Sequence, residues 1–130
     1  MDFNPAPAVG NQGQSWTSGA KDLVSTSLTG RVWVTIGRGI VNEVFWPAVD
    51  QPQLKDLGFL VRAGNGPPAQ WREVKAVNSY TISPLGDPDV PLATIIHTGD
   101  FYRLSLTIVP DPDHDALLVS YDLTGLAGVS

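Results

Sequence analysis

The clearest hydrophobic pattern along the chain lies in the segment YRLSLTIV at residues 102–109. Its apolar side chains occupy every second position, which is the period of a β-strand with one buried face. The segment ALLVSYDL at 116–123 repeats the alternation after the sequence DPDHD. Because aspartate and proline favour turns, we expect the two segments to pair as a hairpin whose tip spans residues 110–115.

Glycine and proline interrupt the rest of the chain too often for helices of ordinary length. Thirteen glycines and eleven prolines are scattered along it, and valine, isoleucine, threonine and aromatic residues gather between them. This distribution predicts an all-β fold, an antiparallel β-sandwich of short strands. The expected strands are residues 31–36, 40–45, 57–62, 74–82, 93–97, 101–109 and 116–123. Residues 53–57 are the one place where a helical turn is expected.

The composition of the N-terminal end predicts a boundary near Trp16. Residues 1–15 are mostly proline, alanine, glycine, asparagine and glutamine, which is typical of a flexible arm, and residues 16–130 form the expected sandwich domain. Trp33 stands between two valines in a predicted strand, so we expect it in the core. No strong stop signal follows the last strand, and we expect the domain to be truncated on its C-terminal side.

Charge and cysteine content narrow the classes of partner. Eight basic and thirteen acidic residues give a net charge of −5, which disfavours binding to nucleic acid or to an anionic membrane surface. No apolar run approaches the roughly 20 residues of a membrane-spanning helix. The chain has no cysteine, which excludes disulfides and thiolate metal sites but leaves the compartment open.

The sequence Gly37-Arg38-Gly39 follows a predicted strand and invites comparison with a nucleotide-binding loop. The third glycine of that fingerprint would fall on Asn42, and the residues that follow are strand-like, so a dinucleotide site is disfavoured and no cofactor is expected. We interpret the segment as a tight structural turn in which Gly37, Gly39 or both take a positive φ.

Asp111, Asp113 and Asp115 alternate as the oxygen ligands of a calcium loop do. The sixth position of such a loop requires glycine and is Ala116 here, so the favoured interpretation is an acidic hairpin tip that caps backbone N–H groups, with calcium as the weaker alternative. The two histidines, His97 and His114, are far apart in the sequence and form no zinc-binding spacing.

Residues 32–57 carry a longer and more specific pattern. In order, they contain V-W-x-T-x-G-R-G, E-V-x-x-P and D-x-P-x-x-x-D-L. This run resembles the N-terminal domain of bacterial glucoamylases and glucodextranases of glycoside hydrolase family 15. The resemblance implies a large supersandwich of the galactose mutarotase-like type, roughly twice as long as this chain, of which the chain is the first half.

The resemblance also implies a function. In this family the sandwich is followed by a linker and a helical (α/α)6 barrel that holds the catalytic carboxylates of an exo-acting, inverting α-glucoside hydrolase. We therefore expect a non-catalytic domain that braces the barrel, with α-glucan as the substrate of the parent enzyme and a secreted or periplasmic location favoured. A stand-alone carbohydrate-binding module and a purely structural assembly domain are the alternatives.

The resembling segment holds the candidate site residues. Glycoside hydrolysis requires paired carboxylates, but Glu43, Asp50 and Asp56 lie outside the barrel, so we expect no catalytic residue in this chain. We expect Asp50 and Asp56 to hydrogen-bond the backbone of their loop. Trp46 and Pro47 either pack in the sandwich or against the barrel, or lie at the mouth of the cleft, where an indole stacks on sugar. All four are expected at the interface with the catalytic domain or with carbohydrate.

The expected truncation has a consequence for assembly. Half of a large sandwich exposes strand edges and part of an apolar face, both of which promote association. We therefore expect a homodimer that forms through exposed strand edges.

Overall fold

Ten β-strands and one short 3-10 helix make up the part of the chain that the computed structural model describes, residues 19–64, 68–77, 79–87 and 92–126. The first strands are β1 (Leu23–Thr26), β2 (Trp33–Gly37), β3 (Ile40–Phe45) and β4 (Pro52–Leu57). Next come β5 (Leu60–Ala63), β6 (Gln70–Glu73), the 3-10 helix η1 (Val74–Ala76) and β7 (Tyr80–Pro84). The last are β8 (Ala93–Thr98), β9 (Tyr102–Pro110) and β10 (Leu117–Gly125). The expected arm at 1–15 and Trp16 lie outside the described residues.

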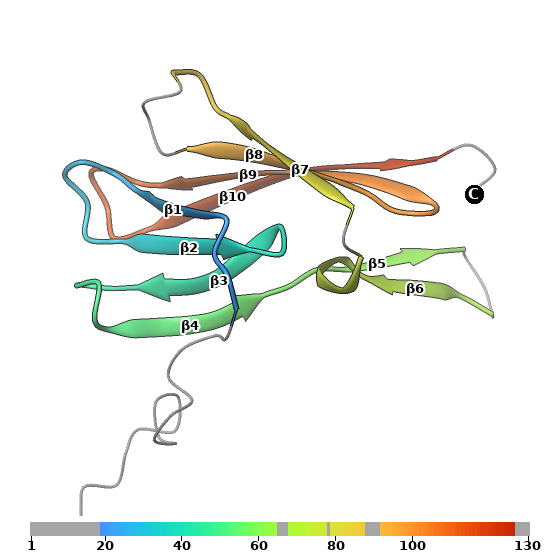
Figure 1. Cartoon of the computed structure of the whole chain (residues 1–130), viewed down its shortest axis with the longest axis horizontal. Helices are drawn as coiled ribbons and strands as arrows, with labels where there is room; N and C mark the ends of the chain where they lie inside the picture. Colours follow the sequence, from blue (N-terminus) through green and yellow to red (C-terminus); the bar gives the residue numbers. More distant parts are fainter. Residues whose placement is uncertain (1–18, 65–67, 78, 88–91, 127–130) are drawn as a thin grey trace, which may run out of the picture.

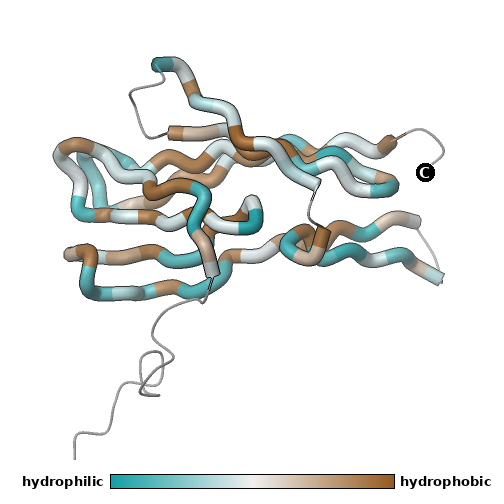
Figure 2. Tube along the Cα trace, in the orientation of Figure 1, coloured by the Kyte–Doolittle hydropathy of each residue, from teal (hydrophilic) through white to brown (hydrophobic). Residues whose placement is uncertain are grey.

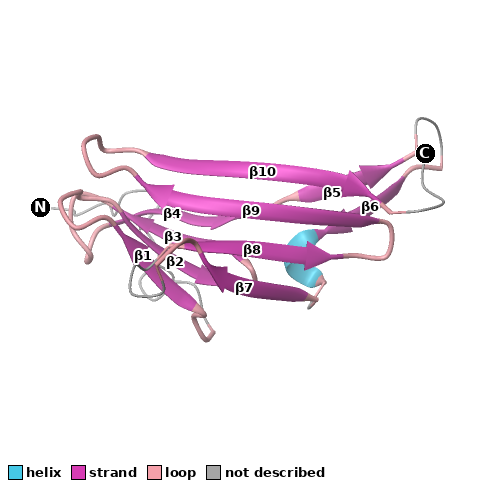
Figure 3. Ribbon diagram, turned by 90° about the horizontal axis from the view of Figure 1, so that it is seen from above, coloured by secondary structure: helices cyan, strands magenta, loops and turns pink. Residues whose placement is uncertain are grey.

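The strands form two four-stranded antiparallel sheets, in the orders β1-β2-β3-β4 and β10-β9-β8-β7, and a separate β5–β6 hairpin. Figure 1 shows the two larger sheets as stacked layers, with the β5–β6 hairpin beyond the end of the β1–β4 sheet. Seen from above, β10, β9, β8 and β7 lie side by side across the upper layer (Figure 3). The predicted all-β antiparallel sandwich is confirmed.

The core lies between the layers and is built from alternate positions of the central strands. Apolar and polar residues alternate along these strands, most regularly in β9 (Figure 2). Burial of the apolar set removes it from water, which is the main favourable contribution to folding. The buried cluster includes Val32, Val34, Ile36, Ile95, Leu104, Leu106 and Ile108.

An irregularity between β2 and β3 decides which side chains leave this core. Ile36 pairs with Val41, but the neighbouring Thr35 pairs with Glu43, so Asn42 is an extra residue in the manner of a β-bulge. Val41 therefore stays in the core, whereas Glu43 shares the outer face of the sheet with Thr35. Trp33 also lies on that outer face and is only half-buried, so its predicted place in the core is wrong.

Several predicted elements need correction, because tertiary pairing outweighs local preference. Residues 53–57, predicted as a helical turn, lie within β4, which pairs with β3. The strand predicted at 57–62 is divided, since Leu57 ends β4 and pairs with Val41, whereas β5 begins only at Leu60. The strand predicted at 74–82 begins with η1. The short strands β1 and β6 were not predicted. The predicted hairpin is confirmed. β9 and β10 pair along their length, from Tyr102 opposite Gly125 to Pro110 opposite Leu117, and the loop at 111–116 connects them.

β10 carries an apolar face that its own layers leave uncovered. Tyr121 and Leu123 pair with Leu106 and Leu104, which are buried in the core, so they lie on the inward face of the sheet. They are nevertheless 69% and 50% exposed. The inward face of β10 thus extends past the strands of the opposite sheet.

Candidate functional site: three loops at one end of the sandwich

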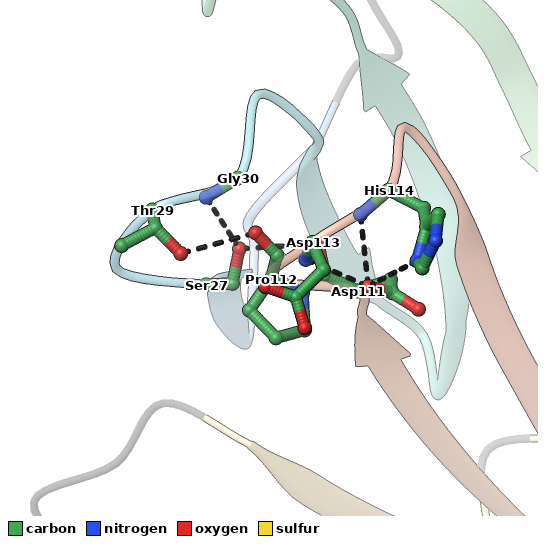
Figure 4. A network of polar contacts seen from close by, with 7 residues as sticks. All are labelled: Ser27, Thr29, Gly30, Asp111, Pro112, Asp113 and His114. Atoms are coloured by element: carbon green, nitrogen blue, oxygen red, sulfur yellow. Dashed lines mark hydrogen bonds and ion pairs between the residues drawn. The ribbon is translucent and has the colours of Figure 1, made fainter.

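Three loops from different parts of the chain meet at one end of the sandwich. They connect β1 to β2 (residues 27–32), β3 to β4 (46–51) and β9 to β10 (111–116), and we call this region the three-loop end. Thr29 donates its hydroxyl hydrogen bond to the carbonyl of Pro112 at 3.0 Å, and Ser27 donates to the carbonyl of Asp111 at 3.4 Å. These contacts, drawn in Figure 4, fasten the first loop to the third.

Arg31 connects all three loops through one side chain. Its Nε donates to Oδ1 of Asp115 at 3.2 Å, and its Nη2 pairs with Oδ2 of the same carboxylate. Such a two-point guanidinium–carboxylate pair fixes direction as well as distance. The guanidinium also lies 5.7 Å from the ring centroid of Trp46, within the range of a cation–π contact. The ring of Trp46 is therefore contacted by a guanidinium of the first loop, which Asp115 of the third loop orients.

The Asp115 carboxyl has an electrostatic environment that favours its charged form. The hydrogen bonds from Arg31 are the largest influence and lower its pKa; desolvation opposes them, and a smaller contribution from a hydrogen bond with Trp46 again lowers the pKa. Asp115 is thus an anion that orients both a guanidinium and an indole. Trp46 keeps 39% of its surface exposed in this arrangement.

The loop that carries Trp46 and Pro47 is shaped by its backbone and by one amide side chain. The Trp46–Pro47 peptide bond is cis. Trp46 N–H donates to the Gln51 carbonyl at 3.1 Å, and the Gln53 amide donates to the Trp46 carbonyl at 2.7 Å. Asp50 is exposed, and no hydrogen bond between its carboxylate and this backbone is found among the described contacts. Gln53 supplies that contact instead.

Asp56 lies at the other end of the β3–β4 pair and does not belong to the three-loop end. Its carboxylate accepts a hydrogen bond from the Asn42 amide at 3.1 Å and pairs with the Lys75 ammonium. Burial raises the pKa of Asp56, but the hydrogen bonds from Lys75 and Asn42 outweigh that effect and lower it. The predicted contact between Asp56 and the loop backbone is therefore replaced by two side-chain contacts.

The acidic hairpin tip separates its three aspartates. Asp111 Oδ1 accepts from the backbone N–H of Asp113 at 2.8 Å and of His114 at 2.9 Å, which lowers the pKa of Asp111 (Figure 4). This is the predicted capping of backbone N–H groups. Asp115 instead binds Arg31. Within the described ranges, no three acidic, histidine or cysteine side chains are grouped so that they could hold a metal ion.

The turn at residues 37–39 connects β2 to β3, as predicted, at the end of the hairpin opposite Trp46. Positive φ occurs at Gly39 (69°) and at Arg38 (53°), and Gly37 is absent from the positive-φ set. Gly37 is constrained by packing instead: a Cβ there would lie 2.2 Å from Oδ1 of Asn42 and would displace that side chain. The glycines are thus structural, one through its dihedral angle and one through close packing.

The sequence pattern singles out Trp46 and, at the acidic hairpin tip, Asp115, but it gives no sign that Arg31 and Asp115 pair beside Trp46. Arg31 and Asp115 are 84 positions apart, and no local motif joins them. The three-loop end could be recognised only after the β9–β10 hairpin had been placed beside the β1–β2 loop.

Comparisons with known proteins agree with this architecture. The chain matches the family described as glucodextranase, domain N, over residues 6–129. A glucoamylase of Clostridium sp. (strain G0005) is 26% identical over 132 residues, which cover 97% of this chain and 18% of that relative. In the described part of the chain, no helix has the length and apolarity needed to cross a membrane. Since the family match extends over nearly the whole sequence, the chain belongs to the glucodextranase domain N family.

Proposed function

We propose that this chain is the non-catalytic N-terminal domain of a glucoamylase-type enzyme, an exo-acting, inverting α-glucoside hydrolase, and that its three-loop end braces the catalytic domain. The family membership and the small share of the relative that the chain covers support this assignment. The remaining polypeptide of such an enzyme would supply the (α/α)6 barrel and bind the α-glucan.

The carboxylates of the described residues support a non-catalytic role. An inverting glycosidase needs two carboxyl groups facing one sugar, and the general acid needs a raised pKa so that it still holds a proton. Every described carboxyl with a resolved shift, namely Asp56, Asp100, Asp111 and Asp115, has a lowered pKa. Each of them is also engaged with a cation or with backbone N–H groups. None has the environment of a general acid.

The observation that carries the bracing role is the held but exposed indole of Trp46. Aromatic side chains fixed in one orientation lose little entropy when a partner covers them, which makes them favourable anchors at interfaces. Arg31 and Asp115 fix Trp46 from two other loops. A surface held in this way is suited to contact with a folded domain.

A stand-alone carbohydrate-binding module is less well supported. Such a module offers several coplanar exposed aromatic rings to a sugar chain. Among the described residues, the exposed tryptophans are Trp46 and Trp71, which lie on different elements. Each has a guanidinium near its ring, from Arg31 at 5.7 Å and from Arg62 at 5.8 Å. They do not form one stacking platform.

Association with the rest of the parent enzyme tests the proposal. The polypeptide encoded downstream of Ser130 would be produced separately and mixed with this chain, and complex formation would be measured by calorimetry. We expect a complex that Trp46→Ala weakens and that Trp71→Ala, the matched control, leaves intact. We also expect this chain alone to release no glucose from malto-oligosaccharides. Failure of the two polypeptides to associate, or turnover by this chain alone, would refute the proposal.

A further inference from the structure

A polar pocket lies beside the Gly37-Arg38-Gly39 turn, at the end of the β2–β3 hairpin opposite the three-loop end. Its wall includes Asp22, Arg38, Asn42, Lys75 and Tyr80, and we call it the turn pocket. In Figure 1 the β2–β3 turn faces η1, which contributes Lys75. The cavity volume of about 400 Å³ lies within the roughly 300–1,000 Å³ typical of small-molecule sites.

The turn is packed closely against the residues that surround the pocket. A Cβ on Gly37 would lie 2.2 Å from Oδ1 of Asn42, and one on Gly39 would lie 2.9 Å from Cγ of Tyr80. Both glycines therefore lie directly against pocket residues. Behind the pocket wall lies the fully buried side chain of His97, and burial lowers the pKa of its imidazole, which favours the neutral ring. The Nε2–H of this ring donates a 2.7 Å hydrogen bond to the carbonyl of Gly39.

Backbone strain is concentrated around the same pocket. Arg38 (φ 53°) and Asp56 (φ 55°) are the non-glycine residues with positive φ in the described ranges. Arg38 lines the pocket, and Asp56 binds two of its wall residues, Asn42 and Lys75. A positive φ is unfavourable for a side-chain-bearing residue and is often retained at functional sites. The presence of two residues with positive φ at one cavity indicates that this backbone geometry is retained for a function.

The polar groups of the turn pocket can donate and accept hydrogen bonds at once. Arg38 has five N–H donors and no ion-pair partner among the described contacts, and Lys75 has two N–H donors beyond the one used for Asp56. Asp22 accepts from the Tyr80 hydroxyl at 2.8 Å and keeps a second carboxylate oxygen as an acceptor. The two cations are balanced by the carboxylates of Asp22 and Asp56. This balance suits an uncharged polyhydroxyl ligand better than an ion.

Tyr80 adds an apolar face to this polar set. Its ring packs against His97 with centroids 5.4 Å apart, which restricts its orientation. A ring held at the wall of a polar pocket can contact the C–H face of a sugar while charged groups bind its hydroxyls.

From this arrangement we infer that the turn pocket binds a single glucosyl unit of an α-glucan, with Arg38, Lys75 and Asp22 as hydrogen-bonding groups and Tyr80 as the apolar wall. The choice of a glucosyl unit rests on the proposed function. The pocket would hold the substrate chain away from the catalytic domain and take no part in bond cleavage.

Titration of the complete 130-residue chain with glucose, maltose and isomaltose, followed by ¹⁵N-resolved NMR, tests this inference. We expect shifts at the backbone amides of Arg38, Asn42 and Tyr80. Arg38→Gly removes the guanidinium, and glycine adopts the positive φ without strain, so the fold should be kept while affinity falls about tenfold, as expected for lost charge-assisted hydrogen bonds. Arg62→Ala, on the separate β5–β6 hairpin, is the control and should bind as the wild type does.

Each outcome decides the inference independently of the bracing role. Sugar-induced shifts confined to the turn pocket and lost in Arg38→Gly would support it. No shift at tens of millimolar sugar, shifts centred on Trp46 or Trp71, or unchanged affinity in Arg38→Gly would overturn it. Binding of acetate in place of sugar would also overturn it, because the ligand would then be a carboxylate. Association with the downstream polypeptide tests the bracing role separately.

Discussion

Neighbouring positions in the β2–β3 turn have opposite requirements at the scale of single residues. Arg38 carries a side chain where glycine would be relaxed, whereas Gly39 has no room for any side chain. A Cβ on Gly39 would lie 2.3 Å from Cε1 of the buried His97, and its φ of 69° is unfavourable for other residues. The turn therefore tolerates a side chain at residue 38 but not at residue 39.

We predict that Gly39→Ala lowers the free energy of unfolding by about 2–5 kcal/mol, the sum of a left-handed backbone cost and an overpacking cost. Arg38→Gly should change it by less than about 1 kcal/mol, because relief of strain offsets the added entropy of the unfolded chain. Urea unfolding of the two variants checks the pair. Equal losses of unfolding free energy in the two variants would contradict the predicted clash between a side chain at residue 39 and His97.

His97 gives the stability of the fold a pH dependence. Burial lowers its pKa from the ordinary 6.5, and its hydrogen bond with Gly39 opposes this only in part. Below pH 6.5 the unfolded chain therefore binds a proton that the folded chain does not. Stability is fully present above that pH and declines as the pH falls toward the lowered value.

We predict that the urea midpoint of the wild type falls between pH 7 and pH 5 and that His97→Gln reduces this fall. His114→Gln, which alters the exposed histidine at the hairpin tip, is the control and should retain most of it. The measurement is a set of urea unfolding curves at matched ionic strength. An equal fall of the urea midpoint between pH 7 and pH 5 in the wild type and in His97→Gln would assign the pH dependence to other groups.

At the scale of elements, the three-loop end depends on contacts between loops that are far apart in the sequence. Arg31 of the β1–β2 loop and Asp115 of the β9–β10 loop both act on Trp46 of the β3–β4 loop. Because the pKa of the Asp115 carboxyl is lowered, these contacts should persist until the pH falls below its usual value of 3.8.

We predict that the indole N–H resonance of Trp46 titrates with a midpoint below pH 3.8 in the wild type. Arg31→Ala should move that midpoint up toward the ordinary value, since the largest cause of the lowered pKa is then gone. Asp115→Asn should abolish the titration. NMR of the indole resonance at a series of pH values gives all three results. The same midpoint in the wild type and in Arg31→Ala would contradict the role of Arg31 in lowering the pKa of Asp115.

At the scale of the whole molecule, the sequence predicts what depends on local pattern. The β9–β10 hairpin follows from a period of two in both strands, and the resemblance to the family is visible in the run at 32–57. β4 could not be predicted in this way, because the alternation of apolar and polar residues that begins at Pro52 stops at Asp56, and pairing with β3 is what makes the segment a strand. The Arg31–Asp115 contact and the turn pocket depend on that same assembly, so no local signal marks them.

The uncovered edge of β10 leads to the last prediction, that the isolated chain dimerises through this strand. Its exposed side chains include Leu118 (53%), Tyr121 (69%) and Leu123 (50%), and β10 is an edge of its sheet, with unpaired backbone groups along one side. A lysine at such an edge opposes strand pairing, so Tyr121→Lys should shift the chain toward monomer, whereas Leu28→Lys, at a fully exposed loop position, should not. Sedimentation velocity over a range of concentrations measures this, and a wild-type chain that stays monomeric throughout would rule out the dimer.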